Sequence, residues 1–314
     1  MMNQIRRTAA VLCLFALTAV LPASSQAPSD VTVNLELSQL FYYAGDPLPV
    51  RISVGNNGSD SLSNPVKIDL SRGFKILKDG KPLERADSKV AEPTRPSKLA
   101  PLTFYGAVVD LAALYPGLGQ VGSYSISWEG NGVRSQELLI KMLPKYDPAK
   151  RYEAEVQTSM GNYTITFAAD ISPIAVKAFV DMANADFYDA LPIHEVRPKL
   201  SVAAGDAQYA PTPRRPFLFP AEKSSRPVLA GTVILKPAQP SPPANSSQFV
   251  VMLRPEPALL GQVTVLGQVT KGLDVVKRIS EVASSAQTSR PAFKPLKDVT
   301  IRDIVVRELA ASGS

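Results

Sequence analysis

A single histidine and a single cysteine limit the chemistry that this chain of 314 residues can perform. Zinc sites assembled from several histidine or cysteine ligands are excluded, and Ser-His-Asp chemistry would have to use His194 alone. Glu195 follows His194 directly, and Arg197 lies two positions beyond Glu195. In an extended strand the side chains of Glu195 and Arg197 share a face, about 6–7 Å apart. Arg197 therefore either reaches into a cleft as a donor or pairs with Glu195, and pairing is the favoured interpretation.

The composition is that of a folded protein with more than one domain. Hydrophobic residues make up 45% of the chain and charged residues 20%, which excludes a disordered acidic or basic tail. A length of 314 residues corresponds to about two domains of ordinary size. Lys and Arg exceed Asp and Glu by 34 to 28, but no dense basic cluster with interleaved aromatic residues is present, so nucleic-acid binding has little support. No cofactor and no metal site is predicted.

The amino terminus has the features of a secretory signal peptide. Arg6 and Arg7 precede an apolar run from Thr8 to Leu21, and small residues follow the run. The run has about 14 residues, fewer than the ~20 that a membrane-spanning helix needs. We expect residues 1–27 to be removed on export, which leaves a periplasmic or secreted protein with no stable membrane span. Cys13 leaves with this segment, so the mature chain has no disulfide and its stability rests on packing.

Residues 28–146 have the alternating pattern of short β-strands. Residues 31–37 alternate between apolar and polar types, and residues 48–54 do so again after a turn-rich segment. The pair Asp79-Gly80 predicts a hairpin turn, in which Gly80 can adopt a positive φ. Turns recur at about ten-residue spacing, as in sandwich folds. We therefore predict seven or so short antiparallel strands in a β-sandwich.

This first half resembles the immunoglobulin-like domains of many exported bacterial proteins. The similarity rests on Tyr43-x-Gly45-Asp46-Pro47, on the Asn56-Asn57-Gly58 turn and on the Gly122-x-Tyr124 strand. It implies a sandwich that serves as a binding or spacer module, and a fold alone assigns no chemistry. The segment after Pro144 is short, polar and bracketed by a second proline, so we place a linker at residues 147–152.

The second half, residues 153–309, begins with a hairpin and a helix. The alternation in residues 156–167 predicts two strands with Gly161-Asn162 at the turn between them. Residues 170–184 have the apolar spacing of an amphipathic helix, with Pro173 in its first turn.

The order of these elements resembles that of cyclophilin-type prolyl isomerases. The resemblance is carried by Thr158-x-x-Gly161, Pro173-x-Ala175-Val176-x-x-Phe179, Phe187-Tyr188-Asp189, His194, Gly205-Asp206, Asn245-Ser246-Ser247-Gln248-Phe249, Leu259-x-Gly261, Val265-x-Gly267-x-Val269, Gly272-x-Asp274-Val275-Val276 and Pro295-Leu296-x-Asp298-Val299-x-Ile301. It implies a mainly β fold, with a closed eight-stranded antiparallel barrel and two capping helices near residues 173–185 and 273–280. Proline-containing segments of exported proteins are the partners that it implies.

The resemblance also implies a reaction, rotation about the X–Pro amide bond. The barrier of ~18–20 kcal/mol comes from the partial double-bond character of the C–N bond, so a catalyst must weaken that resonance. In active members of the family an arginine, in the pattern Phe-His-Arg-Val, donates a hydrogen bond toward the prolyl nitrogen. Here the pattern is Ile193-His194-Glu195-Val196, and an ionised glutamate only accepts hydrogen bonds. Glu195 thus stands at the catalytic position, with Arg197 as a possible substitute donor.

The other positions of the implied substrate site are partly changed. The family pattern is kept at His194, Gln248 and Leu259. Leu200 and Val250 stand where the family has phenylalanine, and Ala203 stands where it has glutamine. The predicted substrate-binding residues are His194, Leu200, Ala203, Gln248, Val250 and Leu259. Because amide rotation involves no proton transfer, we expect His194 to be a hydrogen-bonded wall of the site and not an acid or base.

Two hypotheses follow from the sequence. The first is an exported isomerase of the cyclophilin type that acts weakly on X-Pro bonds of exported proteins, because Glu195 replaces the arginine. The second is a non-catalytic binding or scaffold protein of the cell envelope, in which both halves present an interaction surface. The substitutions in the implied substrate site motivate the second hypothesis.

Overall fold

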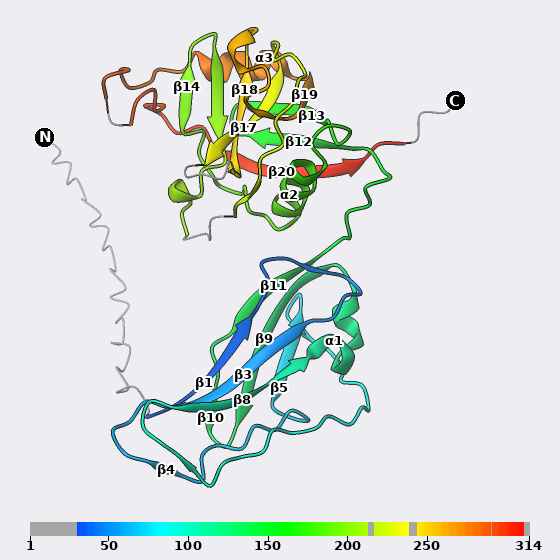
Figure 1. The fold of residues 1–314 in the computed structure, drawn as a ribbon, viewed down its shortest axis with the longest axis vertical. Coiled ribbons are helices and arrows are strands. Elements are labelled where there is room, and N and C mark those ends of the chain that lie inside the picture. Colours follow the sequence, from blue (N-terminus) through cyan, green and yellow to red (C-terminus); the bar gives the residue numbers. More distant parts are fainter. Residues whose placement is uncertain (1–29, 213–216, 239–243, 290, 311–314) are drawn as a thin grey trace, which may run out of the picture.

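The computed structural model describes residues 30–212, 217–238, 244–289 and 291–310. The predicted signal peptide, residues 1–27, lies outside the described residues. The strands form separate sheets in an N-terminal half and a C-terminal half (Figure 1). Each half has its own hydrophobic cluster. The domain boundaries predicted from the sequence stay predictions. Within the described part of the chain, no helix has both the length and the apolar character needed to cross a membrane.

The N-terminal half is built from short strands and one helical turn. Its elements are β1 (Val31–Leu37), β2 (Tyr42–Tyr43), β3 (Pro49–Asn56), β4 (Leu62–Ser63), β5 (Phe74–Lys78), β6 (Lys81–Pro82), β7 (Lys98–Leu99), β8 (Phe104–Asp110), α1 (Leu111–Leu114), η1 (Pro116–Gly119), β9 (Gly122–Gly130), β10 (Val133–Arg134) and β11 (Leu138–Leu143). One sheet has the order β1-β3-β8 and another has the order β2-β11-β9-β5-β6. Inward-facing side chains of both sheets share one core, in which Leu35, Ile52 and Trp128 are fully buried.

The alternation read from the sequence is confirmed in this half. Val33 and Leu35 of β1 are buried, Asn34 and Glu36 are exposed, and Thr32 is half-buried. Asp79 and Gly80 both have positive φ, 50° and 77°, and connect the paired residues Lys78 and Lys81, as a two-residue hairpin turn requires. The expectation of purely antiparallel pairing is wrong at one place, because β2 pairs with β11 in parallel. The chain leaves the first sheet after β1 and joins the edge of the second sheet at Tyr42.

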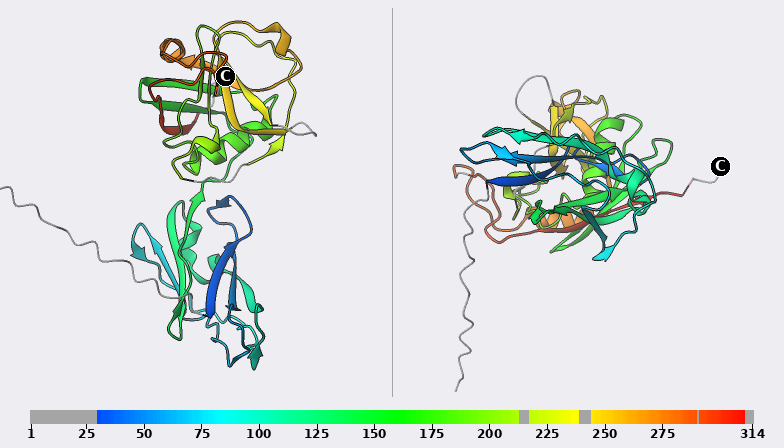
Figure 2. Two further views of the ribbon diagram at one scale, coloured as in Figure 1. Left: turned by 90° about the vertical axis from the view of Figure 1, so that its left-hand side faces the viewer. Right: turned by 90° about the horizontal axis from the view of Figure 1, so that it is seen from below.

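The C-terminal half is one curved sheet with two helices against it (Figure 2). Its elements are β12 (Tyr152–Thr158), β13 (Gly161–Phe167), α2 (Pro173–Asn184), β14 (Glu195–Arg197), β15 (Ser201–Ala204), η2 (Ala207–Tyr209), β16 (Phe219–Pro220), β17 (Thr232–Ala238), β18 (Ala244–Met252), η3 (Pro257–Leu259), β19 (Thr264–Lys271), α3 (Leu273–Ser280) and β20 (Ile301–Glu308). Eight strands follow the path β14-β15-β18-β17-β19-β13-β12-β20, and β16 pairs with β18.

The two ends of this path approach each other without a strand ladder between β14 and β20. An isolated bridge joins Pro192 to Thr300, and the backbone N–H of Ile193 donates to the carbonyl of Val299 at 2.7 Å. The contact is made by the segment just before β14 and the segment just before β20. The closed form of the barrel therefore stays a prediction, whereas the mainly β character and the two helices are confirmed.

The first hairpin of this half turns two residues earlier than the sequence predicts. Thr158 pairs with Gly161, so Ser159 and Met160 form the turn and Gly161 already belongs to β13. The side chain of Thr158 explains the difference, because its Oγ1 accepts from the N–H of Met160 at 3.1 Å and donates to the carbonyl of Gly161 at 2.6 Å. These two bonds satisfy the backbone of the tight turn.

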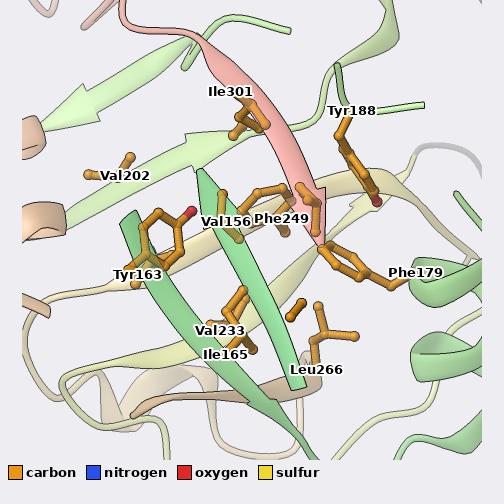
Figure 3. Close-up of a cluster of buried hydrophobic side chains, with 14 of the residues drawn as sticks. Val156, Tyr163, Ile165, Phe179, Tyr188, Val202, Val233, Phe249, Leu266 and Ile301 are labelled. Atoms are coloured by element: carbon orange, nitrogen blue, oxygen red, sulfur yellow. The ribbon is translucent and has the colours of Figure 1, made fainter. Parts of the chain in front are cut away.

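Helix α2 begins at Pro173, as the pattern predicts, and packs its apolar face on the core. Phe179 of this helix stacks on Tyr188, with ring centroids 4.9 Å apart, and meets Phe249 edge to face at 5.6 Å. Figure 3 shows these rings among aliphatic side chains of the sheet. This arrangement of aromatic rings holds α2 against the inner face of the sheet.

The two halves contact each other through α2. The hydroxyl of Tyr43, in β2, donates to Oδ2 of Asp181 at 2.7 Å, and Nζ of Lys177 donates to both the Tyr43 hydroxyl and Asp181 Oδ2. The Asp181 side chain is 4% exposed. In a further contact between the halves, the rings of Phe41 and Phe217 meet edge to face at 5.3 Å. The contact between the halves is therefore both polar and apolar.

Candidate active site

Three adjacent strands bring predicted site residues onto one face of the C-terminal sheet. Glu195 in β14 lies opposite Ala203 in β15, and Ala203 lies opposite Val250 in β18. Directly opposed residues project to the same face of a sheet. The intervening residues of these strands, such as Val202 and Val251, are buried in the main core. The face of Glu195 is therefore the outer face.

An apolar cluster covers this outer face. The predicted residues Leu200, Val250 and Leu259 are partly buried and pack against it. The buried members are Val228, Ile234, Met252, Val263 and Val265. The structure thus brings together three side chains that lie up to 59 positions apart in the sequence. Because its members are aliphatic, the cluster offers an apolar surface without the aromatic rings that the family pattern would supply at Leu200 and Val250.

Ile234, Met252 and Val265 of this cluster were absent from the predicted site. Met252 follows Val250 by two positions in β18, so strand alternation alone could have identified it. Ile234 and Val265 come from β17 and β19, and they reach the same face because Ile234 pairs with both Val250 and Val265. That register depends on β-bulges in the ladders, and no local signal in the sequence specifies it.

Glu195 and Arg197 form an ion pair at the edge of this face. The Nε of Arg197 lies 2.7 Å from Oε1 of Glu195, and the two side chains are 45% and 24% exposed. The Arg197 guanidinium also lies over the ring of Phe293, 5.1 Å from its centroid. Phe293 is held beside β14 because its carbonyl accepts from the N–H of Val196 at 2.9 Å. The pairing favoured from the sequence spacing is present, and it directs the guanidinium toward Glu195 and Phe293.

His194 is buried and stacks on an aromatic ring. It is 7% exposed, and its ring lies 5.6 Å from that of Tyr209 with an angle of 22° between the planes. Burial lowers the pKa of His194, and the nearby carboxylates of Asp206 and Glu195 only partly oppose this effect, so the imidazole is neutral at pH 7. Neither ring nitrogen has a hydrogen-bond partner among the described residues. Among the described residues a ring contact with Tyr209, and not the expected hydrogen bond, holds the imidazole, and its place in the wall of the site stays a prediction.

Gln248 presents an unpaired acceptor in the same region. It lies in β18 two positions before Val250 and is partly buried. Its Oε1 is buried and has no hydrogen-bond partner within the described part of the chain. A buried carbonyl oxygen without a partner is costly, and an N–H of a bound peptide would satisfy it. Chemically, the region combines an apolar surface, one buried amide acceptor and one carboxylate.

Comparisons with known proteins place this arrangement in a family. The family model described as cyclophilin type peptidyl-prolyl cis-trans isomerase/CLD matches residues 153–306. The match begins within β12 and ends within β20. It therefore spans the nine-stranded sheet and both helices of the C-terminal half.

Individual relatives are similar over almost their whole lengths. The peptidyl-prolyl cis-trans isomerase-like 1 of Neurospora crassa is 32% identical over 161 residues, which make up 50% of this chain and 95% of the relative. The peptidyl-prolyl cis-trans isomerase ppi1 of Schizosaccharomyces pombe is 33% identical over 146 residues, 46% of this chain and 93% of the relative. A crystal structure of a cyclophilin type peptidyl-prolyl cis-trans isomerase from Cryptosporidium parvum has a TM-score of 0.45 and 19% identity, and the similarity covers 49% of this chain and 98% of that one.

Proposed function

Because the chain belongs to the cyclophilin family of peptidyl-prolyl cis-trans isomerases, we propose that it is an exported, isomerase-like protein that acts weakly on X-Pro bonds of exported proteins. The observation that carries the weak turnover is the carboxylate of Glu195, which stands at the position of the family's arginine and is paired with Arg197 at 2.7 Å. The apolar cluster around Val250 and Leu259 receives the proline ring.

The chemistry of amide rotation explains why this replacement matters. A donor aimed at the prolyl nitrogen weakens C–N resonance and lowers the barrier to rotation. Ionised Glu195 has no proton to donate, and the Nε donor of Arg197 is engaged with Glu195. Loss of one preorganised donor typically costs roughly 10²–10³ in rate. We therefore expect turnover well below that of members with arginine at this position.

A protease-coupled assay on an Ala-Pro peptide tests the proposal. The wild-type protein is compared with Glu195→Arg and with Glu281→Arg, a matched control at an exposed position after α3. We expect a small rate above the spontaneous reaction, an increase for Glu195→Arg and no change for Glu281→Arg. A wild-type rate equal to the spontaneous one would contradict the enzyme assignment. A Glu195→Arg rate equal to that of the wild type would contradict the explanation of weak turnover by the missing arginine.

The second candidate is a non-catalytic binding or scaffold protein of the cell envelope. It is supported by the aliphatic cluster on the outer face of the C-terminal sheet, together with the contact of Tyr43 with Asp181, through which both halves would present one continuous surface. Capture from envelope extract by the full chain, and by a variant with Val250→Asp in the apolar cluster, tests it. Retention of a partner by the wild type and its loss in the variant, without isomerase activity, would favour this candidate over the first.

The N-terminal half supports a spacer or binding role of the immunoglobulin-like type. Its two sheets, β1-β3-β8 and β2-β11-β9-β5-β6, enclose one core around Trp128, as two-sheet sandwiches do. Export is inferred from residues 1–27, which lie outside the described residues. Fractionation of cells, with mass spectrometry of the mature amino terminus, tests it, and an uncleaved chain in the cytoplasm would overturn it.

A further inference from the structure

Strand β8 is an edge strand, and within the part of the chain that the structure describes no strand pairs with its outer side. It is the last strand in the order β1-β3-β8 (Figure 1). Hydrogen bonds from Asn56 N–H to the Thr103 carbonyl and from Leu111 N–H to the Leu48 carbonyl, both 2.9 Å, flank the β3–β8 ladder. In an antiparallel ladder the bonded residues alternate. The odd-numbered residues of β8 therefore bond to β3, and the N–H and C=O groups of Phe104, Gly106 and Val108 point away from it.

These outward backbone groups form no hydrogen bond with any other segment in the described ranges. The side chains of the same residues project from the outer face of the sheet, where Phe104 is 68% exposed and Val108 is 62% exposed. Leu102, just before the strand, is 82% exposed. Residues 104–109 include no charged side chain. Charges are the usual protection of a free edge, so this edge is open to pairing.

The opposite edge of the same sheet is closed. Strand β1 forms that edge, and the side-chain amide of Gln136 takes the place of a neighbouring strand there. Its Oε1 accepts from the N–H of Leu35 at 3.2 Å, and its Nε2 donates to the carbonyl of Leu35 at 2.6 Å. One edge of the sheet is therefore blocked by a specific side chain, whereas the edge at β8 is uncovered and apolar.

We propose that β8 pairs antiparallel with β8 of a second copy of this chain, about a two-fold axis at Gly106. In this register Gly106 lies opposite Gly106 of the partner subunit, and Phe104 lies opposite the partner's Val108. All of these residues have outward N–H and C=O groups, so the hydrogen bonds match. An aromatic residue opposite a β-branched residue is a favourable cross-strand pair, and the two three-stranded sheets become one of six strands.

We assign the partner strand to a second copy of this chain because the β8 edge is complementary to the same edge of that copy. The two-fold places large apolar side chains opposite each other and glycine opposite glycine, and it brings no like charges together within residues 104–109. A Cβ at position 106 would lie 2.1 Å from the Ile52 carbonyl oxygen, so glycine there is also required by the close approach of β3. Because Gln136 blocks the β1 edge, the assembly closes at two copies instead of growing.

A pairing through one short strand is small compared with most stable interfaces, so we expect a dimer that dissociates on dilution. Sedimentation velocity of the full chain over a range of concentrations measures the dissociation constant. A protein that is monomeric at every concentration, up to millimolar, would overturn the proposal.

A pair of charge variants tests the register. In Phe104→Lys with Val108→Lys, lysine faces lysine at both positions. In Phe104→Lys with Val108→Glu, lysine faces glutamate, although the same apolar side chains are removed. We expect a dissociation constant about tenfold or more higher for the first variant than for the second. Equal constants would overturn this pairing, and circular dichroism checks that both variants fold.

Cross-linking gives an independent measurement. In a chain with Cys13→Ser, the double substitution Phe104→Cys and Val108→Cys places the two thiols of each facing pair within disulfide reach, since bonded antiparallel residues have Cα atoms about 5.5 Å apart. Oxidation should give a species of twice the mass. Val108→Cys alone is the control, because the two copies of position 108 are four residues apart, about 13 Å. Cross-linking of the control as fast as the double variant would contradict the register.

Discussion

The hydroxyl of Tyr43 donates a hydrogen bond of 2.7 Å to Oδ2 of Asp181, which joins the N-terminal half to helix α2 of the C-terminal half. Asp181 is buried, and Lys177 donates to the same oxygen at 2.5 Å. The ammonium group also lies 4.8 Å from the centroid of the Tyr43 ring. A charge-assisted bond of this kind stabilises more than a neutral one, so the polar group holds the two halves in one arrangement.

Tyr43→Phe should loosen this arrangement. The ring remains but the donor to Asp181 is lost, which costs about 1.5–3 kcal/mol for a hydrogen bond to a charged group. We expect faster tryptic cleavage after Lys145, Lys150 and Arg151, which lie in the connecting segment. Tyr209→Phe is the control, because the Tyr209 ring stacks on His194 away from this contact. Equal cleavage rates of Tyr43→Phe and the wild type would show that the bond does not hold the halves together.

Arg197→Ala distinguishes a structural arginine from a catalytic one. The guanidinium lies beside Glu195 and over Phe293, so we expect the isomerase rate to change by less than about twofold. An exposed ion pair contributes only about 0–1 kcal/mol, so stability should also change little. A loss of all activity above the spontaneous rate would identify Arg197 as the substitute donor.

Leu200→Ala and Leu259→Ala should each weaken the binding of a proline-containing peptide. Both side chains pack against the apolar cluster on the outer face, and each buried methylene group contributes about 0.8 kcal/mol. We expect the dissociation constant to rise several-fold in titration calorimetry. Leu296→Ala is the matched control, since Leu296 is 71% exposed and outside the cluster. Equal affinities in all three variants would show that the peptide binds outside the apolar cluster.

Stability should fall as the pH drops below about 6.5, the ordinary pKa of histidine. Burial lowers the pKa of His194 in the folded chain, so the unfolded chain takes up the proton first as the pH falls. The contribution of neutral His194 to the free energy of unfolding is therefore fully present above the pKa of the unfolded chain and is lost as the pH falls below it. The chain has one histidine, so His194→Phe should remove this component in urea titrations between about pH 7 and pH 5. The same pH dependence in the variant would contradict the assignment to His194.

Local patterns predicted the elements well, because each pattern depends on residues that are close in sequence. The alternation in β1 and the proline at the start of α2 specify a strand and a helix wherever the chain continues. The pairing of Glu195 with Arg197 was also accessible, since two positions in a strand define one face.

Contacts between residues that are distant in the sequence could not be predicted in the same way. Ile234 reaches the outer apolar cluster through ladders that contain β-bulges, and Tyr43 meets Asp181 across 138 positions. Each of these contacts depends on how finished elements pack, which no spacing of residues along the chain encodes. The turn at Ser159 and Met160 was missed for a local reason, because glycine was favoured at the turn while the Thr158 hydroxyl stabilised an earlier one.

The single imidazole, buried against the Tyr209 ring, gives this protein a natural NMR probe. A proton of His194 lies within the ring current of Tyr209, so its resonance is displaced from that of a free histidine. Since no other histidine exists in the chain, that resonance needs no assignment by mutagenesis. Movement of the signal on addition of a proline peptide would report binding near His194, whether or not the bound peptide is isomerised.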